Sequence, residues 1–271
     1  MKRLIIRPGA IGDFIVSIPA MECLRTEYLE VWAATQNVPL AARFASRARS
    51  IAATGLNLLE IGEPDPCLLE SLRGFDSIVS WYGTSRPEFR DVVAALRLPF
   101  HFFPALPPEG CGSHAADFYL AQVRALASCT GDGVPRIVCP AARGEFAAIH
   151  PFAGSPKKRW PLERFQELAH KLEQHMPVKW CAGPEDELPG AVRFADLYEL
   201  ACWLAGARIY IGNDSGPTHL AAAVGTPVVA LFGPSDPAVW APRGPRVAIA
   251  AAPSLEDIMV ERVMKLAEDV L

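Results

Sequence analysis

The sequence has no long apolar run and no strong excess of one charge. Its 271 residues include 26 Lys and Arg against 30 Asp and Glu, a net charge of −4. This balance argues against a broad nucleic-acid surface, although a local basic site stays open. No stretch approaches the roughly 18 uncharged apolar residues of a membrane helix, and the apolar run Leu4–Ile6 is too short for a signal peptide. With 51% hydrophobic residues, we expect a cytosolic enzyme with a sizeable core.

Several chemical motifs are also missing. The chain has no Asp-x-Asp pair and no run of His, Cys and carboxylates at metal-ligand spacing. It has neither a G-x-S-x-G elbow nor a Walker lysine loop, so hydrolase triads and P-loop kinases have no support. None of the seven cysteines form a C-x-x-C motif, and we predict buried, reduced thiols rather than metal ligands. The seven are Cys23, Cys67, Cys111, Cys129, Cys139, Cys181 and Cys202.

Strand-like and helix-like segments alternate along the chain, interrupted by a Pro/Gly/Ala-rich stretch at Gly133–Arg143. Repeated β-α units indicate parallel sheets covered by helices, with ligands bound at the carboxyl ends of the strands. We therefore predict an α/β protein with two domains, 1–143 and 144–271, and a last helix that begins at Ser254 and could pack back on the first domain. The predicted strands are 3–7, 30–35, 77–81, 146–150, 178–182, 208–211 and 226–232, and the other helices are 14–26, 86–96, 113–128, 162–172 and 197–205.

The first strand-to-helix turn runs from Arg7 to Asp13 and contains Gly9 and Gly12. Two glycines permit tight turning and close approach of a ligand. The turn is not the G-x-G-x-x-G dinucleotide fingerprint, so an NAD site has weak support. Asp13 has two open interpretations, an N-cap that satisfies free N–H groups or a catalytic carboxylate.

A second loop, His150–Pro161, places three consecutive cations after Gly154 and Ser155. Lys acts as a point charge and Arg as a fork toward phosphate oxygens. Three cations in a loop are often only a solvated basic run, but the position of this loop after a strand favours diphosphate binding. Both interpretations are open. A third loop, Ala182–Glu187, is acidic; it could accept hydrogen bonds from ribose hydroxyls or simply face solvent.

The fourth stretch, Tyr210–Trp240, contains a strand, the turn Gly212–Gly216, a short helix and a second strand. Pro217 suits a first helical turn. Free N–H groups and the positive end of the helix dipole favour phosphate, so the turn is a candidate site for a nucleotide diphosphate. His219 is either bonded to the backbone or a donor to that phosphate.

Three segments, RLIIRPGAIGDFIVSIPA, IHPFAGSPKKRWP and IGNDSGPTHLAAAVGTPVVALFGPSDP, together resemble glycosyltransferase family 9, the bacterial ADP-heptose:lipopolysaccharide heptosyltransferases. The resemblance implies the GT-B fold, with two Rossmann-like domains whose parallel sheets face a central cleft. It also implies inverting, metal-independent and cofactor-free transfer of a sugar, heptose from ADP-heptose, to a lipopolysaccharide-core or related surface-glycan acceptor.

The resemblance also assigns roles. Asp13 matches the general base, Arg7 a cation that keeps it ionised, and Lys158 a lysine that contacts the donor phosphates and steadies the leaving diphosphate. Gly9 and Gly12 fall in the acceptor-side loop. The donor-binding positions are Gly154, Ser155, Lys158, Glu185, Asp214, Ser215, Gly216 and His219.

Two other functions stay open. The N-terminal half, which would hold the acceptor, is compact, so the chain could be a nucleotide-sugar-binding module without transferase activity. A GT-B-like sugar-nucleotide epimerase rests on fold analogy alone. A lipid-linked acceptor would bring the protein transiently to the inner membrane face, although the sequence has no strong basic amphipathic helix.

Overall fold

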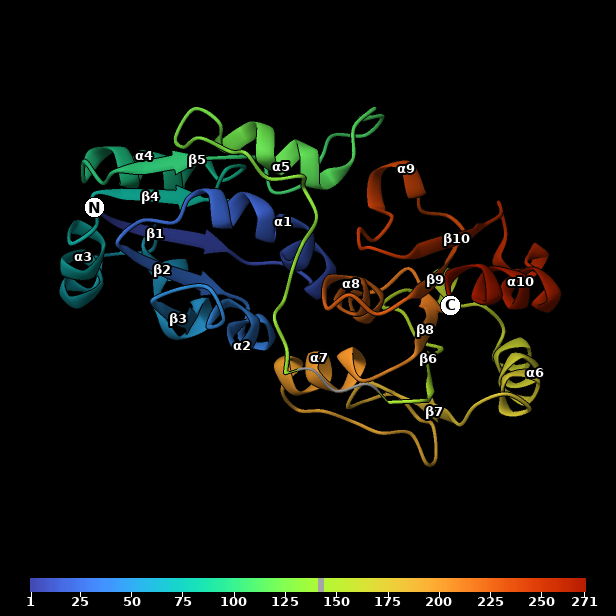
Figure 1. Ribbon diagram of the computed structural model, residues 1–271. Coiled ribbons are helices and arrows are strands. Elements are labelled where there is room, and N and C mark those ends of the chain that lie inside the picture. Colours follow the sequence, from blue (N-terminus) through green and yellow to red (C-terminus); the bar gives the residue numbers. More distant parts are fainter. Residues whose placement is uncertain (141–143) are drawn as a thin grey trace.

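The N-terminal part of the protein is built on a five-stranded parallel sheet (Figure 1). The computed structural model describes residues 1–140 and 144–271. The strand order is β3-β2-β1-β4-β5, so β1 lies at the centre of the sheet. The strands are β1 (Lys2–Arg7), β2 (Tyr28–Ala33), β3 (Arg47–Ser50), β4 (Ser77–Ser80) and β5 (Phe100–Phe102).

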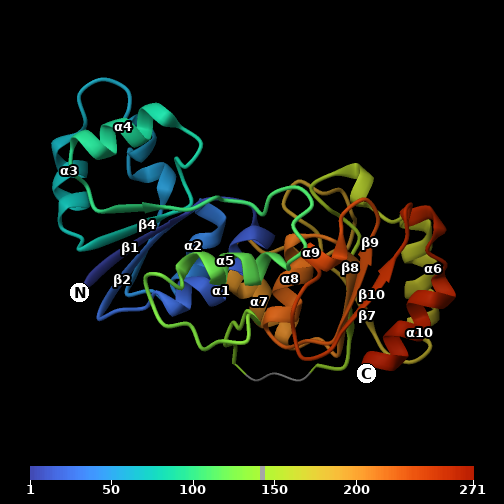
Figure 2. The same cartoon turned by 90° about the horizontal axis from the view of Figure 1, so that it is seen from above.

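Helices cover both faces of this sheet, with α3 and α4 on one side and α1, α2 and α5 on the other (Figure 2). Successive side chains of a strand point to opposite faces, so Leu4 and Ile6 enter one apolar cluster and Ile5 another. The helices are α1 (Ile11–Cys23), α2 (Val38–Ala41), α3 (Pro66–Arg73), α4 (Pro87–Ala95) and α5 (Ala115–Val123), with short 3₁₀ turns η1 (Thr35–Asn37), η2 (Ile51–Ala53) and η3 (Leu56–Leu58).

The C-terminal part has a second five-stranded parallel sheet, in the order β10-β9-β8-β6-β7. Its strands are β6 (Ala147–His150), β7 (Val178–Trp180), β8 (Ile209–Asn213), β9 (Val228–Phe232) and β10 (Val247–Ala251). Its helices are α6 (Leu162–Glu173), α7 (Leu197–Ala205), α8 (Gly216–Ala223), α9 (Pro237–Trp240) and α10 (Val260–Val270), with 3₁₀ turns η4 (Pro156–Lys158) and η5 (Leu255–Asp257). The α/β prediction with two parallel sheets is confirmed.

The two parts share one apolar core, in which α1 and α5 pack with α7 and α8. The N-termini of α1 and α8 meet at glycines. A Cβ atom on Gly216 would lie 2.6 Å from Cβ of Ile11, and one on Gly12 would lie 3.2 Å from Cδ2 of His219. A side chain at Gly216 would clash with Ile11 and one at Gly12 would be tight against His219, so the two glycines permit a close approach that brings the two strand-to-helix turns of the predicted site together.

The predicted domain boundary at 143/144 borders residues 141–143, which lie outside the described part. The last helix is wrong in extent: Ser254 caps η5, and α10 begins only at Val260. That helix packs on α6, β9 and β10 of the C-terminal part, and the buried apolar cluster that it joins has no described residue of the first domain.

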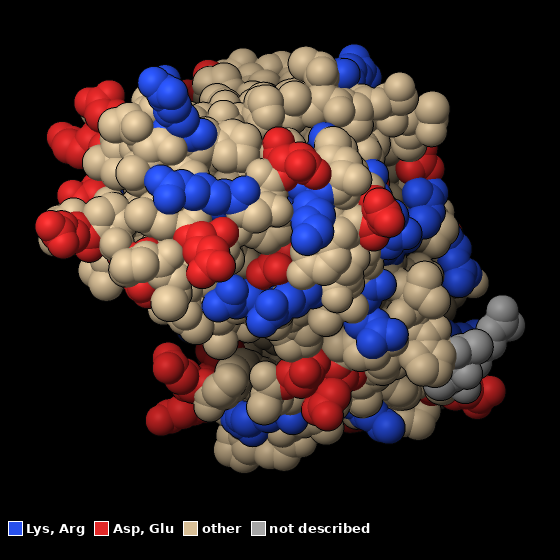
Figure 3. Space-filling model, turned by 90° about the vertical axis from the view of Figure 1, so that its left-hand side faces the viewer, with Lys and Arg blue, Asp and Glu red and all other residues tan. Residues whose placement is uncertain are grey.

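The cysteines were also predicted incorrectly in part. All seven are free thiols, but only Cys181 is buried, Cys67 is exposed and the other five are partly exposed. Apolar sequence neighbours therefore overstated their burial. On the face drawn in Figure 3, Lys and Arg are interspersed with Asp and Glu and form no extended basic field, as the near-neutral charge balance indicated.

Candidate functional site

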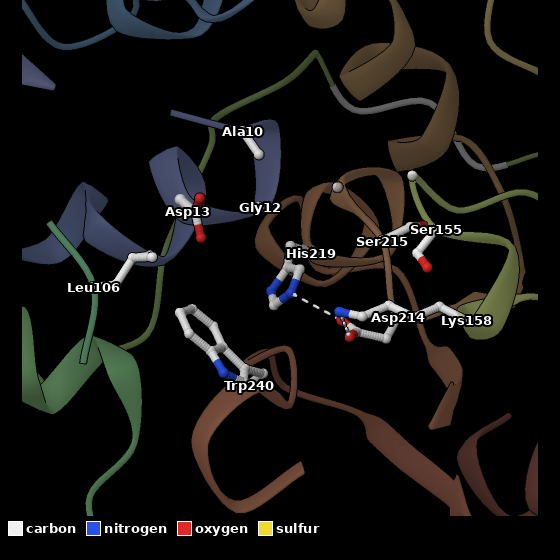
Figure 4. A pocket seen from close by; sticks show the side chains of 12 residues that line it. Ala10, Gly12, Asp13, Leu106, Ser155, Lys158, Asp214, Ser215, His219 and Trp240 are labelled. Carbon is white, nitrogen blue, oxygen red and sulfur yellow. Dashed lines mark hydrogen bonds and ion pairs between the residues drawn. The ribbon is translucent and has the colours of Figure 1, made fainter. Parts of the chain in front are cut away.

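A cavity of about 470 Å³ lies between the two domains, at the carboxyl ends of β1 and β8. Its wall is composite, since α1 contributes from one side and the turns after β6, β8 and β9 contribute from the other (Figure 4). Open α/β sheets bind ligands at this position. The lining residues are Ala10, Gly12, Asp13, Leu106, Gly154, Ser155, Lys158, Asp214, Ser215, Gly216, His219 and Trp240.

The N-terminus of α8 opens onto this cavity. Ser215 is its N-cap, Gly216 is its first residue, and Pro217 lies in the first turn as expected. The first N–H groups of a helix have no intrahelical acceptor, and the dipole adds positive potential there. Asn213 holds the turn, because its Oδ1 accepts from N–H of Trp160 at 2.9 Å and its Nδ2 donates to the carbonyl of Pro151 at 2.8 Å. Two predicted donor loops are thereby fastened to one another.

Lys158 and Asp214 form an ion pair on this wall. Lys158 Nζ donates to Asp214 Oδ2 at 2.7 Å, and the hydroxyl of Ser235 donates to the same oxygen at 2.5 Å. The Asp214 side chain is only 7% exposed, whereas that of Lys158 is 37% exposed. The carboxylate therefore anchors the ammonium group, which keeps an exposed side toward the cavity. An exposed cation next to a helix N-terminus is suited to a diphosphate.

His219 projects between Asp13 and Asp214 (Figure 4). Burial lowers its pKa to about 4, against an opposing effect of Asp214. Its Nε2 lies 3.9 Å from Asp214 Oδ1, beyond hydrogen-bond distance. We conclude that the imidazole is neutral near pH 7, so it can donate one hydrogen bond to a ligand but does not add a positive charge.

Asp13 lies in the first turn of α1 and faces the cavity from the N-terminal domain. Ala10 is the N-cap of α1, so Asp13 is not the N-cap residue itself. Burial raises the pKa of Asp13 above its ordinary value, although Arg7, the backbone N–H of Ala10 and Lys158 each act to lower it. A carboxyl with a raised pKa is a better proton acceptor at neutral pH than an ordinary one.

Arg7 does not line the cavity. It is 1% exposed, and its guanidinium donates to Ser17 Oγ at 3.0 Å, to the carbonyl of Asp13 at 3.0 Å and to that of Ala105 at 3.1 Å. As expected of a nearby cation, Arg7 acts to lower the pKa of Asp13 and so favours its ionised form, although burial has the larger and opposite effect on that pKa. The structure places Arg7 as a support that holds the backbone at Asp13.

Two other predicted residues lie outside the cavity lining. Glu185 is exposed on the loop after β7. Gly9 has a φ of 129°, and a Cβ atom there would lie 3.6 Å from Oδ2 of Asp13; it shapes the turn without facing the ligand space. The sequence reasoning did not single out Leu106 or Trp240, which both line the cavity. For Trp240, a usable signal was its position shortly after the buried strand β9, at the carboxyl end where such sheets bind ligands.

Among residues 1–140 and 144–271, no group of three or more His, Cys, Asp or Glu side chains is placed to hold a metal ion. In the same residues, no helix has the length and apolar character needed to span a membrane.

Comparisons with known proteins agree with this geometry. A model of glycosyltransferase family 9 (heptosyltransferase) matches residues 114–269. Lipopolysaccharide heptosyltransferase 3 of Escherichia coli K12 is 31% identical over 120 residues, 37% of this chain and 34% of that protein. The chain thus matches about a third of the length of that relative.

Solved structures extend the similarity to the whole chain. ADP-heptose lipopolysaccharide heptosyltransferase II of Escherichia coli superposes with a TM-score of 0.77 at 20% identity, covering 100% of this chain and 98% of that one. An Escherichia coli heptosyltransferase solved with ADP gives a TM-score of 0.76 at 17% identity, with full coverage of both. At such identities the similarity shows the fold alone.

Two parallel α/β sheets facing a shared cavity, superposable on these proteins, define the GT-B class of fold. The family match covers more than half of the sequence. The chain belongs to glycosyltransferase family 9. The matched segment contains Lys158, Asp214 and His219 but not Asp13, whose role therefore depends on geometry and on the resemblance of the first turn.

Proposed function

We propose that this protein is an inverting, metal-independent glycosyltransferase that transfers heptose from ADP-heptose to a lipopolysaccharide-core or related surface-glycan acceptor. The observation that carries the proposal is the composite cavity. The C-terminal wall offers Lys158 and the N-terminus of α8, and the N-terminal wall offers the carboxylate of Asp13. One wall suits a nucleotide diphosphate and the other suits proton removal from an attacking hydroxyl.

In this mechanism the donor diphosphate lies against Ser155, Lys158 and the N-terminus of α8. The acceptor hydroxyl attacks the anomeric carbon while its proton passes to Asp13. The bond from the anomeric carbon to the phosphate oxygen breaks, and Lys158 with the N–H groups of α8 stabilises the negative charge on the departing diphosphate. Attack from the face opposite the leaving group inverts the anomeric configuration, which nuclear magnetic resonance of the product would report.

Positive charge for the leaving group comes here from the chain itself, which supports metal-independent transfer. Activity should persist in the presence of EDTA. Loss of transfer on chelation, restored by Mg²⁺, would contradict this part of the proposal. A lipid-linked acceptor would bring the protein to the inner face of the cytoplasmic membrane for each turnover.

The donor class can be tested by thermal unfolding with ADP-, GDP-, UDP- and dTDP-sugars. A ligand at a hundred times its Kd stabilises the native state by about 2.7 kcal/mol, so the matching nucleotide should raise Tm by several degrees. We expect the ADP-sugar to give the largest rise, followed by transfer of its sugar to heptose-deficient lipopolysaccharide. Donor binding without any transfer would favour the alternative, a nucleotide-sugar-binding module.

A further inference from the structure

Trp240 is the largest side chain on the cavity wall and has no role in the mechanism above. It is the last residue of α9 and is partly buried. Figure 4 shows its indole ring extending toward the side of the cavity bounded by Asp13 and Leu106, and away from Lys158. The ring thus lies beside the carboxylate rather than beside the phosphate-binding wall.

The segment that carries Trp240 belongs to the C-terminal domain but is fastened to the N-terminal one. Arg243 donates to both carboxylate oxygens of Asp117 on α5, at 2.8 and 2.5 Å. His114 Nε2 is 2.8 Å from the carbonyl of Ala241, the residue after Trp240. His114 Nδ1 accepts from N–H of Ala116 at 3.1 Å, so Nε2 carries the proton and donates to Ala241.

These contacts, which we call the α5 clamp (His114–Ala241 and Asp117–Arg243), fix Trp240 relative to the domain that contains Asp13. The indole and the carboxylate therefore keep one spacing even though they come from different sheets. A wall that must match both a proton acceptor and a sugar ring needs such a fixed spacing.

The chemistry of this corner suits an uncharged sugar ring. The face of an aromatic ring carries negative potential, and the C–H groups of a sugar face carry partial positive charge, so the two stack favourably. Leu106 adds a second apolar surface to the cavity wall. This residue is 53% exposed and therefore accessible to a ligand. The donor phosphates require the opposite wall, where Lys158 lies, so the ring next to Asp13 belongs to the acceptor.

We propose that Trp240 is the stacking platform for the acceptor sugar whose hydroxyl is deprotonated by Asp13, and that the α5 clamp is its positioning device. This inference rests on the proposed function, because it uses the direction of transfer across the cavity. It adds a determinant of acceptor binding that the donor-side residues do not supply.

Kinetics give the first test, with deacylated core oligosaccharide from heptose-deficient lipopolysaccharide as acceptor and ADP-heptose as donor. Loss of the ring in Trp240→Ala should raise the acceptor KM by about tenfold, with ADP binding within about twofold of wild type. The conservative variant Trp240→Phe should recover most of the loss, because a flat ring remains. Arg243→Gln should raise the acceptor KM in the same direction by a smaller factor while Trp240 is still present.

An unchanged acceptor KM in Trp240→Ala would overturn the proposal, as would a rise confined to the donor KM. If the wild-type protein transfers no sugar at all, the proposed function fails. The role of Trp240 is then tested separately by binding of the core oligosaccharide. Of the six tryptophans, the indole N–H signal of Trp240 can be assigned by its loss in Trp240→Phe. That signal should shift when the core oligosaccharide is added. A shift with ADP alone, or none with the oligosaccharide, would overturn the platform role.

Discussion

Lys158 reaches its place on the cavity wall by donating a hydrogen bond of 2.7 Å to Asp214, a residue 56 positions later in the chain. Asp214 also accepts from Ser235 and is nearly buried. The cation is therefore held by one carboxylate at a fixed point beside the N-terminus of α8, where a diphosphate would share it. The ion pair with the buried Asp214 restricts the movement of the Lys158 side chain but leaves it partly exposed to the cavity.

Removing this cation should weaken donor binding. In Lys158→Ala we expect ADP affinity to fall about 10- to 100-fold, because a hydrogen bond to a charged group contributes about 1.5–3 kcal/mol. Calorimetry measures it directly. The matched control is Lys157→Ala, which removes the same charge from the adjacent exposed position and should leave affinity nearly unchanged. Equal losses in both variants would mean that only the general charge of the loop matters.

The glycine contact between α1 and α8 should be intolerant of a single methyl group. In Gly216→Ala the new Cβ would lie 2.6 Å from Cβ of Ile11, so the domains must separate slightly. Overpacking costs about 1–3 kcal/mol, which outweighs the roughly 1 kcal/mol helical advantage of Ala over Gly. We expect a lower Tm and reduced transfer. Gly112→Ala, which adds a methyl group with nothing within 4 Å, should change neither; a Gly216→Ala protein as stable and active as wild type would refute the contact.

Buried histidines should make the fold sensitive to mild acid. Burial lowers the pKa of His150 from 6.5 to about 4. Between pH 6.5 and 4 the unfolded chain therefore binds more protons than the native one. The contribution of His150 to the free energy of unfolding has its full value above pH 6.5 and decreases as the pH drops toward 4. The loss attributable to His150 is about 3 kcal/mol. Denaturation at several pH values should show a shallower decline in His150→Asn; parallel curves would contradict the assignment.

Activity should have its own acid limb. A general base works only when ionised, and burial raises the pKa of Asp13 above 3.8. We expect kcat/KM to fall with decreasing pH at a midpoint higher than that of an ordinary Asp. Because Lys158 lowers the pKa of Asp13, the limb of Lys158→Ala should move to still higher pH. If both proteins are folded and their acid limbs have the same midpoint, the limb does not report the ionisation of Asp13.

Much of the fold could be predicted because central strands and helices carry regular apolar patterns. Leu197–Ala205 was predicted with its observed bounds, and β9 lies within the predicted strand 226–232. The missed strands β3, β5 and β10 lie at sheet edges. At an edge, burial is partial and the apolar signal fades: β3 reads RARS, and none of its residues is buried. These segments are strands because they pair with a neighbouring strand, and the local sequence does not show that pairing.

The candidate site divides in the same way. Local motifs indicated Asp13, Lys158 and Asp214 because each lies in a turn after a strand of one of the two sheets, and ligands bind at the carboxyl ends of such strands. The position of Trp240 depends on the Asp117–Arg243 pair, which joins residues 126 apart, and no local pattern encodes that. The raised pKa of Asp13 was also beyond sequence reasoning, since it is set mainly by how deeply the folded chain buries the carboxyl.

In the proposed mechanism, Asp13 removes the proton from the acceptor while the opposite domain holds the donor. The most direct measurement compares Asp13→Asn with wild type for both sugar transfer and ADP binding in the same preparations. We predict that kcat falls by about 10²- to 10⁴-fold while the Kd for ADP stays within about twofold. Transfer at the wild-type rate by Asp13→Asn would contradict the account.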